Sequence, residues 1–393
     1  MTLTFTEARE SVLREVCAIG EGESIPLGEA DGRVLAESVT ADRDYPPFPR
    51  SARDGFAVRA ADLPGELSVV GEVRAGEVFR GSIGPGEAVE IMTGAPLPEG
   101  ADAVIMIEHV ERQGDRVITK RTQASGDNFT PRGAEAKQNE AVLTPGTRVG
   151  FAEVAAAVMT GRQCASVYRR PRVAILPTGD EIVETGEKPR DFQIRNSNAW
   201  SLAVQVRRAG GIPEILPIAR DNYESTHASI ELGLQADLLL LSGGVSAGKY
   251  DIVERVLADF GATFFFDRVL IQPGQPLVFG SARKKFFFGL PGNPASTMVT
   301  FELFARAAIE KLSGASTISL PLLRARLTRE FHHKTGLTRF LPAHLSDDGA
   351  AITPEPWQGS GDIASLARAN AFLVAEADRE AWAAGDDIRV MLK

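Results

Sequence analysis

Cysteine and histidine are scarce in this sequence. Its 393 residues contain two cysteines, Cys17 and Cys164, and five histidines, with no Cys-x-x-Cys or Cys/His spacing. Two cysteines cannot form a disulfide framework, and the scattered histidines do not match the ligand spacing of zinc sites. We expect the adjacent pair His332–His333 to be solvated loop residues. These absences argue against a disulfide-rich secreted domain and against a zinc protein.

Long apolar runs and a basic surface are also missing. No stretch approaches the roughly 18 apolar residues that a membrane-spanning helix needs, and the N-terminal MTLTFTEARESVL lacks the basic and apolar regions of a secretory signal. The formal net charge is −9, whereas binding to a nucleic-acid backbone requires a basic surface. We therefore expect a cytoplasmic protein with neither a membrane nor a nucleic acid as partner. A small anionic ligand in a local pocket is compatible with this charge.

The hydrophobic content of 44% is enough for two to four packed domains. Thr4-x-x-Glu7 is a capping-box pattern and predicts a helix after it. From about Tyr45 to Arg148 the sequence consists of short strand-like runs broken by proline and glycine, which indicates a β-rich lobe. Gly150 to Thr160 is typical of a helix that ends at Gly161.

From Arg172 the pattern changes to alternating strands and helices. The short apolar runs VAIL, EILPI, DLLLL and FFFGL are typical of strands buried on both faces. Helical stretches separate or follow them, at residues 197–209, 223–233, 251–260 and 294–312. This alternation predicts a mostly parallel sheet covered on both sides. After Ser313 the helical signal fades, and four strand-like segments predict a small C-terminal β-domain.

Three of the predicted strands end in a glycine-containing loop, in VAIL–PTGDE, LLLL–SGGVSAGKYD and FFFGL–PGNP. Ligands of doubly wound sheets bind beyond the carboxyl ends of the strands, where free backbone N–H groups suit phosphate. One such loop is also the ordinary way to turn a strand into a helix, but three loops on one edge favour a phosphorylated or nucleotide-bearing ligand.

The second loop is a near miss to a nucleotide-binding P-loop. Gly243 to Lys249 fits G-x-x-x-x-G-K, but Tyr250 stands where a P-loop has the Ser or Thr that binds magnesium. The motif also follows the third strand of the unit, whereas a P-loop usually follows the first. We therefore reject the P-loop. Asp251 is either the N-cap of the next helix or a magnesium ligand beside phosphates.

Two more acidic positions are candidates on the residues alone. Asp180 and Glu181 lie at another strand end of the same edge, either in a solvated turn or as carboxylates able to hold a cation or move a proton. Asp54, in SARDGFAV, follows a proline-rich entry to the β-lobe, and composition alone makes it a turn residue.

With these residues collected, the sequence resembles the molybdopterin molybdenumtransferase family, which comprises the bacterial MoeA proteins and the E domain of gephyrin. The resemblance extends over essentially the whole chain, and nine motifs carry it in order: PPFPRSARDGFAVR, EIMTGAPLPEGADAVIMIEHV, PRGAEAKQNEAVL, ILPTGDEI, IRNSNAW, LSGGVSAGKYD, QPGQPLVFG, LPGNPAS and GSGDIASLARAN. Their combination is highly specific, because no single element carries it.

The resemblance implies a multidomain α/β fold with four parts: a discontinuous helical linking domain (1–44 and 140–168), an inserted β-rich lobe (45–139), a doubly wound αβα domain like that of molybdopterin adenylyltransferases (169–313) and a C-terminal β-barrel-like domain (314–393). It also implies an elongated homodimer whose active site forms between the α/β domain of one subunit and the β-lobe of the other. The implied reaction is insertion of molybdate into adenylylated molybdopterin with release of AMP and assistance from Mg²⁺. Molybdopterin adenylyltransferase would be a further partner.

Carried over residue by residue, the resemblance implies a catalytic set of Asp54, Thr93, Glu135, Glu181, Asp221 and Asp251, with Glu181, Asp221 and Asp251 as the metal ligands. Glu135 stands where the family often has Asp. The implied substrate-binding residues are Gly179, Ser242, Gly243, Gly244, Ser246, Lys249, Gln272, Gly274, Gln275, Pro291, Gly292, Asn293, Arg339 and Ser360.

Two departures from the family pattern concern the oxyanion. The family usually has a lysine at one or both polar positions of K-P-G-K-P, where this chain has Gln272 and Gln275. An uncharged amide donates a hydrogen bond roughly half as strong as a charged donor does. In the C-terminal domain, GLTRFLPA stands where the family often shows G-R-x-x-F-x-R, so that Arg339 is displaced by two positions. The candidates for a compensating cation are Arg268, Arg283, Lys284 and Arg339.

Three alternatives to molybdate insertion remain open. The first is a catalytically weak scaffold that retains the pterin-nucleotide pocket, and the two glutamines favour it. The second is a paralogue that uses tungstate or another oxyanion. The third, an ATPase, is disfavoured by Tyr250. The retained carboxylates favour the enzyme, since a scaffold has no need of so many in matching places.

Overall fold

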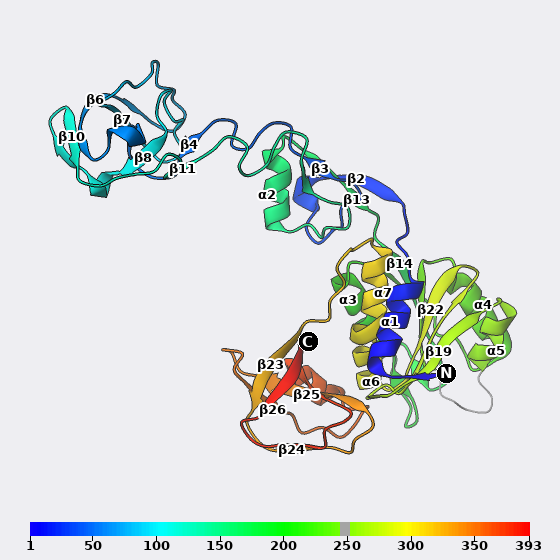
Figure 1. Ribbon diagram of the computed structural model, residues 1–393. Coiled ribbons are helices and arrows are strands. Elements are labelled where there is room, and N and C mark those ends of the chain that lie inside the picture. The colour runs from blue at the N-terminus through cyan, green and yellow to red at the C-terminus, as the bar shows by residue number, and fades with distance from the viewer. Residues whose placement is uncertain (244–251) are drawn as a thin grey trace.

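The computed structural model describes residues 1–243 and 252–393 of the chain. The molecule is elongated, with a β-rich lobe at one end, a small linking module in the middle, and an α/β sheet beside a C-terminal β-domain at the other end (Figure 1). This multidomain α/β architecture confirms the predicted fold class.

The α/β part is built on a seven-stranded sheet. Its strands, in spatial order, are β1 (Thr2–Leu3), β19 (Thr263–Val269), β21 (Pro276–Ala282), β22 (Lys285–Leu290), β18 (Leu238–Ser242), β14 (Arg172–Pro177) and β17 (Ile212–Ile215). The last four run parallel to one another, as predicted. A crossover that contains a helix connects β14 to β17, and another connects β17 to β18. Strand β21 is antiparallel to both of its neighbours, so the run from Thr263 to Leu290 is a meander that strand–helix alternation alone does not predict.

Helices cover both faces of this sheet, which makes it doubly wound. One face packs against α1 (Phe5–Glu15), α3 (Ser197–Arg208), α6 (Pro294–Thr300), the π-helical turn η4 (Phe301–Ala305) and α7 (Arg306–Leu312), and the other against α4 (Tyr223–Gly233) and α5 (Ile252–Asp259). The predicted helical stretches match these elements to within a residue or two. The capping box is present as well, since Thr4 N–H donates to the Glu7 carboxylate (2.8 Å) and Glu7 N–H to the Thr4 hydroxyl (3.3 Å).

The N-terminal segment lies elsewhere than the resemblance implies. Residues 1–44 are expected in the linking domain, but β1 pairs in parallel with β19, and Val12 and Val16 are fully buried in the core of the α/β sheet. The apolar face of α1 requires a large partner surface, and the sheet with α7 provides it. The segment before residue 17 therefore belongs structurally to the α/β part.

The linking module is mostly extended rather than helical, which corrects the second part of that expectation. Strand β2 (Gly22–Pro26) pairs with β13 (Cys164–Tyr168), and β3 (Val39–Thr40) pairs with β12 (Ala141–Leu143). Helix α2 (Phe151–Met159) and the 3₁₀ turn η1 (Leu27–Glu29) complete it. Its small core joins Leu35 and Val39 to Ala157 and Val167.

The lobe inserted between the two halves of this module is β-rich, as predicted. A short ladder of β4 (Arg50–Ser51) and β11 (Phe129–Thr130) lies at its entrance. Its main sheet has the spatial order β8 (Ala103–Met106), β5 (Gly55–Val58), β7 (Glu87–Ile91), β6 (Gly65–Val73), β10 (Arg116–Thr119) and β9 (Glu111–Gln113). Apolar clusters lie on both faces, with Phe56 in one and Ile91 in the other.

The C-terminal domain contains a closed five-stranded β-barrel, which confirms the barrel-like expectation. The ring consists of β25 (Thr338–Leu345), β26 (Ala351–Pro354), β23 (Leu322–Leu327), β29 (Asp387–Leu392) and β27 (Ala371–Ala375), which pairs back to β25. Outside the ring are the ladder of β24 (Phe331–His332) and β28 (Ala381–Trp382) and helix α8 (Ile363–Arg368). His333 is buried and stacks on Trp382. His332 is exposed, as expected, but it lies in strand β24 and not in a loop.

Within the described part of the chain, no helix is both long and apolar enough to cross a membrane.

Candidate functional site

The carboxyl ends of β14, β18 and β22 lie side by side, and a cavity of about 630 Å³ opens above them. The two strands that follow β14 in the chain lie on opposite sides of it within the sheet, first β17 and then β18. The order of the strands therefore reverses at β14, and the cavity lies at this switch point of the topology. Thr178, Gly243 and Gly292 from the three predicted loops line it. Its volume lies within the range of roughly 300–1,000 Å³ that small-molecule sites occupy.

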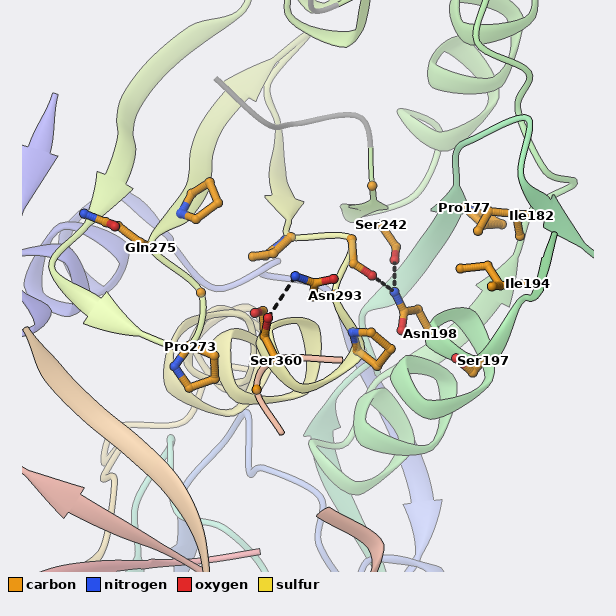
Figure 2. A pocket seen from close by; sticks show the side chains of 18 of the residues that line it. Pro177, Ile182, Ile194, Ser197, Asn198, Ser242, Pro273, Gln275, Asn293 and Ser360 are labelled. Atoms are coloured by element: carbon orange, nitrogen blue, oxygen red, sulfur yellow. Dashed lines mark hydrogen bonds between the residues drawn. The ribbon is translucent and has the colours of Figure 1, made fainter. Parts of the chain in front are cut away.

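The C-terminal domain forms the opposite wall. Leu337, Trp357 and Ser360 from that domain face the loop Gln272–Pro276, and strand β20 (Ile271–Gln272) pairs in parallel with Thr338–Arg339 of β25. Asn293 Nδ2 donates to the Ser360 hydroxyl (2.8 Å) across the same junction, as Figure 2 shows. The cavity is thus shared by two parts of the chain that lie far apart in sequence.

The wall of the cavity is polar but nearly uncharged. Among its described lining residues only Glu181 and Arg195 carry a charge, and Arg195 Nε donates to the Glu187 carbonyl (3.1 Å). Gln272 and Gln275 present amides where a cation would attract an anion more strongly. The hydrogen-bond donors that the described part of the wall offers to an anionic group are therefore mainly neutral.

Three buried polar atoms on this wall have no hydrogen-bond partner: Thr178 Oγ1, Asn196 Nδ2 and Asn198 Oδ1. They are three of only seven such side-chain atoms among the described residues. A buried polar atom without a partner destabilises a protein by about 1–3 kcal/mol, so native structures contain few of them. Their concentration at one cavity indicates that a ligand supplies the missing partners.

Acidic residues gather at the neighbouring ends of β14 and β17. Asp180 N–H donates to the Asp221 carboxylate and Asp221 N–H to the Asp180 carboxylate, both at 3.3 Å, and Glu181 lies on the cavity wall. Oxygen ligands of this kind are what Mg²⁺ prefers. Across residues 1–243 and 252–393, however, no group of three or more acidic, His or Cys side chains is placed to hold a metal.

The β-lobe carries a second acidic group. Asp54 accepts hydrogen bonds from Thr93 N–H (2.7 Å) and from the Thr93 hydroxyl (2.8 Å). These bonds, the backbone one first, hold the pKa of Asp54 below its ordinary value, so the carboxylate is ionised at neutral pH. Glu135 pairs with Arg50 (2.6 Å) in the same lobe. Figure 1 places this lobe at the opposite end of the molecule from the α/β sheet, so one chain does not bring both groups together.

The predicted site residues therefore fall into four groups. Those on the cavity wall are Glu181, Ser242, Gly243, Gln272, Gly274, Gln275, Pro291, Gly292, Asn293 and Ser360. Gly179, Asp221 and Arg339 lie next to the wall: Gly179 contacts Glu181, Asp221 contacts Asp180, and Arg339 is opposite Gln272 in the β20–β25 register. Asp54, Thr93 and Glu135 lie in the remote lobe. Gly244, Ser246, Lys249 and Asp251 lie outside the described residues.

Sequence reasoning overlooked the side chains Asn196, Asn198 and Thr178. The stretch IRNSNAW contains both asparagines, and a signal was available: Asn196 is an N-cap residue, immediately before a predicted helix. Only the structure shows that each asparagine uses one half of its amide locally and leaves the other half unpaired.

Comparisons with known proteins agree with this architecture. Residues 3–161 match the family model of the MoeA N-terminal region (domain I and II), residues 174–311 a probable molybdopterin binding domain, and residues 324–393 the MoeA C-terminal region (domain IV). The chain is 34% identical to the molybdopterin molybdenumtransferase of Bacillus subtilis (strain 168) over 400 residues, which cover 98% of this chain and 93% of that protein. It is also 34% identical to the protein of that name from Nostoc sp. (strain PCC 7120), over 94% and 88% of the two chains.

Among solved structures, the molybdopterin biosynthesis MoeA protein from Pyrococcus horikoshii OT3 superimposes with a TM-score of 0.83 at 29% identity, over 100% of both chains.

Proposed function

The chain belongs to the molybdopterin molybdenumtransferase family, and from that membership we propose that it inserts molybdate into adenylylated molybdopterin with release of AMP. The similarity to these relatives by itself supports a more general assignment, a transferase of molybdenum cofactor biosynthesis. The observation that carries the proposal of molybdate insertion is the cavity at the switch point of the sheet, because the turns after β18 and β22 line it on one side and amide and hydroxyl donors line it on the facing wall. Phosphate oxygens suit the first and an oxyanion suits the second.

In the proposed reaction an oxygen of molybdate attacks the phosphorus of the adenylyl group, and the phosphoanhydride bond to the pterin phosphate breaks. AMP leaves with that oxygen, and the thiolates of the pterin bind the molybdenum. The loop after β22, which lines the cavity with Gly292 and Asn293, would hold phosphate oxygens through backbone N–H groups. Gln272, Gln275 and Ser360 donate hydrogen bonds to the oxyanion from the other side. Fixing both partners in one cavity would contribute to the rate enhancement through orientation. We place the reaction in the cytoplasm, as the sequence predicts.

Magnesium is the metal we propose for this site. Glu181, Asp221 and Asp251 would hold it, and the donor set fits because all three are carboxylates and two of them lie at neighbouring strand ends. Bound there, Mg²⁺ would neutralise charge on the phosphates. Removal of divalent metal by a chelator should abolish AMP release, and added Mg²⁺ should restore it.

We further propose that the active site is completed by a second copy of the chain. Asp54 and Thr93 form a preorganised acidic group that does not line the cavity at the switch point of its own chain. Exposed apolar side chains on two helices support self-association: Phe151 (92% exposed) and Val158 on α2, and Trp200 (53%) and Val204 on α3. In a two-fold dimer the lobe of one subunit would reach the cavity of the other.

AMP release from adenylylated molybdopterin tests the proposal directly. Purified protein with Mg²⁺ is titrated first with molybdate and then with tungstate. Release that depends on molybdate supports the transferase, and release that depends only on tungstate identifies a paralogue that uses that oxyanion. Tight pterin binding without release for either oxyanion would replace the proposal by a scaffold, a function that Gln272 and Gln275 favour.

A further inference from the structure

The amide groups of Asn196 and Asn198 are oriented unambiguously, although the two ends of an asparagine amide look alike. Asn196 Oδ1 accepts a hydrogen bond from Ala199 N–H (3.2 Å) and caps helix α3, so its Nδ2 is the free end. Asn198 Nδ2 donates to the Ser242 hydroxyl (3.0 Å) and to the Gly292 carbonyl (2.8 Å), so its Oδ1 is the free end. A carbonyl can only accept, which fixes the second assignment.

The first turn of α3 therefore presents one unused donor and one unused acceptor at the same cavity. Asn196 is 3% exposed, and both free atoms are closed to water and without a partner. Figure 2 shows Asn198 beside Ser242, with dashed lines for the hydrogen bonds that its amide nitrogen donates. Because the folded protein has already desolvated these atoms, a ligand that supplies partners recovers hydrogen bonds without a further loss of water.

The cavity wall beside the two asparagines is suited to a flat ring. Ile182 and Ile194, from the two-residue ladder of β15 (Ile182–Val183) and β16 (Ile194–Arg195), contribute apolar surface there. A ring reaches the closed atoms only if this ladder moves aside, and a ladder of two residue pairs has little intrinsic stability to oppose that movement. A fully ionised phosphate or oxyanion has no hydrogen to donate and cannot pair with an acceptor such as Asn198 Oδ1.

We infer that Asn196 and Asn198 read the edge of a nitrogen heterocycle that carries both an N–H donor and an acceptor atom. The acceptor of the ring pairs with Asn196 Nδ2, and the N–H of the ring pairs with Asn198 Oδ1. A pterin offers this combination in its cyclic amide, and an adenine offers it in its amino group and ring nitrogen. The inference rests on the proposed function, whose substrate contains both rings, and it assigns the α3 side of the cavity to one of them.

Asn196→Ser is the variant that tests the donor. Serine retains an N-cap acceptor for Ala199 N–H but removes the free Nδ2. Asn222→Ser is the matched control. Asn222 caps α4, the next helix along the chain, by accepting a hydrogen bond from Ser225 N–H, and it does not line the cavity. Thermal unfolding of both variants shows whether the cap exchange has equal effects on folding.

Two probes, pterin-6-carboxylate and AMP, are titrated against the full chain by fluorescence and calorimetry. We expect Asn196→Ser to weaken one probe about three- to tenfold, as the loss of one neutral hydrogen bond predicts, while Asn222→Ser binds both as the wild type does. The affected probe identifies the ring. On the ligand side, N6,N6-dimethyl-AMP or 3-methylpterin lacks the N–H donor, and it should lose affinity in the wild type by a similar factor.

Unchanged binding of both probes by Asn196→Ser, or full affinity for the methylated ligands, overturns the inference while leaving the proposed function intact. If the wild type itself binds neither probe, the proposed function falls together with the inference.

Discussion

Mixing two inactive variants should restore activity if the active site is shared between subunits. Asp54→Asn damages the lobe and leaves the cavity intact, whereas Glu181→Gln damages the cavity and leaves the lobe intact. In a mixed dimer one of the two sites combines the intact cavity of the first variant with the intact lobe of the second. One chain holds the two groups at opposite ends of the molecule. In a dimer of a single variant, every site therefore contains the altered residue, and no site is complete.

The expected recovery follows from counting sites. Random association of equal amounts gives mixed dimers as half of the population, and each mixed dimer has one intact site of two, so activity should reach about 25% of the wild type under two-fold symmetry. The assay is AMP release after co-expression or after denaturation and refolding of the mixture. Asp115→Asn, at an exposed lobe position, is the control and should keep full activity by itself.

Activity that stays at the level of the separate variants, in a mixture shown to contain mixed dimers, would refute the shared site. Every site built within one chain would then contain one of the two defects. The reach of the lobe into the cavity of a partner would have to be abandoned, although the cavity itself would stand.

Three further predictions concern single positions. Asp237 is buried and binds Arg169 (2.7 and 3.0 Å) and Arg172 N–H (2.8 Å); although burial raises its pKa, these bonds lower it to about 2. By linkage to this pKa shift, Asp237→Asn should lower the free energy of unfolding at pH 7 by about 2–3 kcal/mol. Urea titrations should show this difference shrinking as the pH falls from the ordinary pKa of 3.8 towards 2. Gln275→Lys should lower the molybdate concentration for half-maximal AMP release about five- to tenfold, since a charged donor replaces a neutral one; an unchanged value would show that the oxyanion is held elsewhere. Gly274→Ala should lower the unfolding temperature and the activity, because Gly274 has φ +104° and a Cβ there would lie 2.3 Å from Thr300 Cγ2. The double variant with Thr300→Ser removes that overlap, so a full recovery would show that the backbone angle carries no strain.

The sheet and its edge were predictable from sequence because their signals are local. Continuous apolar runs such as LLLL, each followed by glycine, specify buried parallel strands whose carboxyl ends must meet. The cavity lined by Ser242 and Gly292 therefore lies at the carboxyl ends of these strands, where the sequence predicts a ligand site. Helix α3 likewise begins at Ser197, the residue at which the expected stretch begins.

Long-range partners could not be predicted in this way. The pairing of β1 with β19 joins Thr2 to Arg268, and no local pattern specifies a partner so distant in the chain. The free Asn196 Nδ2 depends equally on which atoms lie opposite it after folding. His333 illustrates the same limit, because its burial against Trp382 comes from a ladder formed by segments about fifty residues apart.

The placement of β1 and α1 on the α/β sheet has a consequence for folding during synthesis. Val12 and Val16 are synthesised early, but the core that buries them includes Phe266 and Ile309, so the sheet and α7 that cover them are complete only after residue 312 has been made. The same core extends to residues as late as Met391. Between these times the β-lobe can fold by itself, since its sheet is formed from residues 55–119. The apolar face of α1 must remain unburied or be shielded until nearly 300 further residues have followed it. The chain thus closes its largest core by returning to its own beginning.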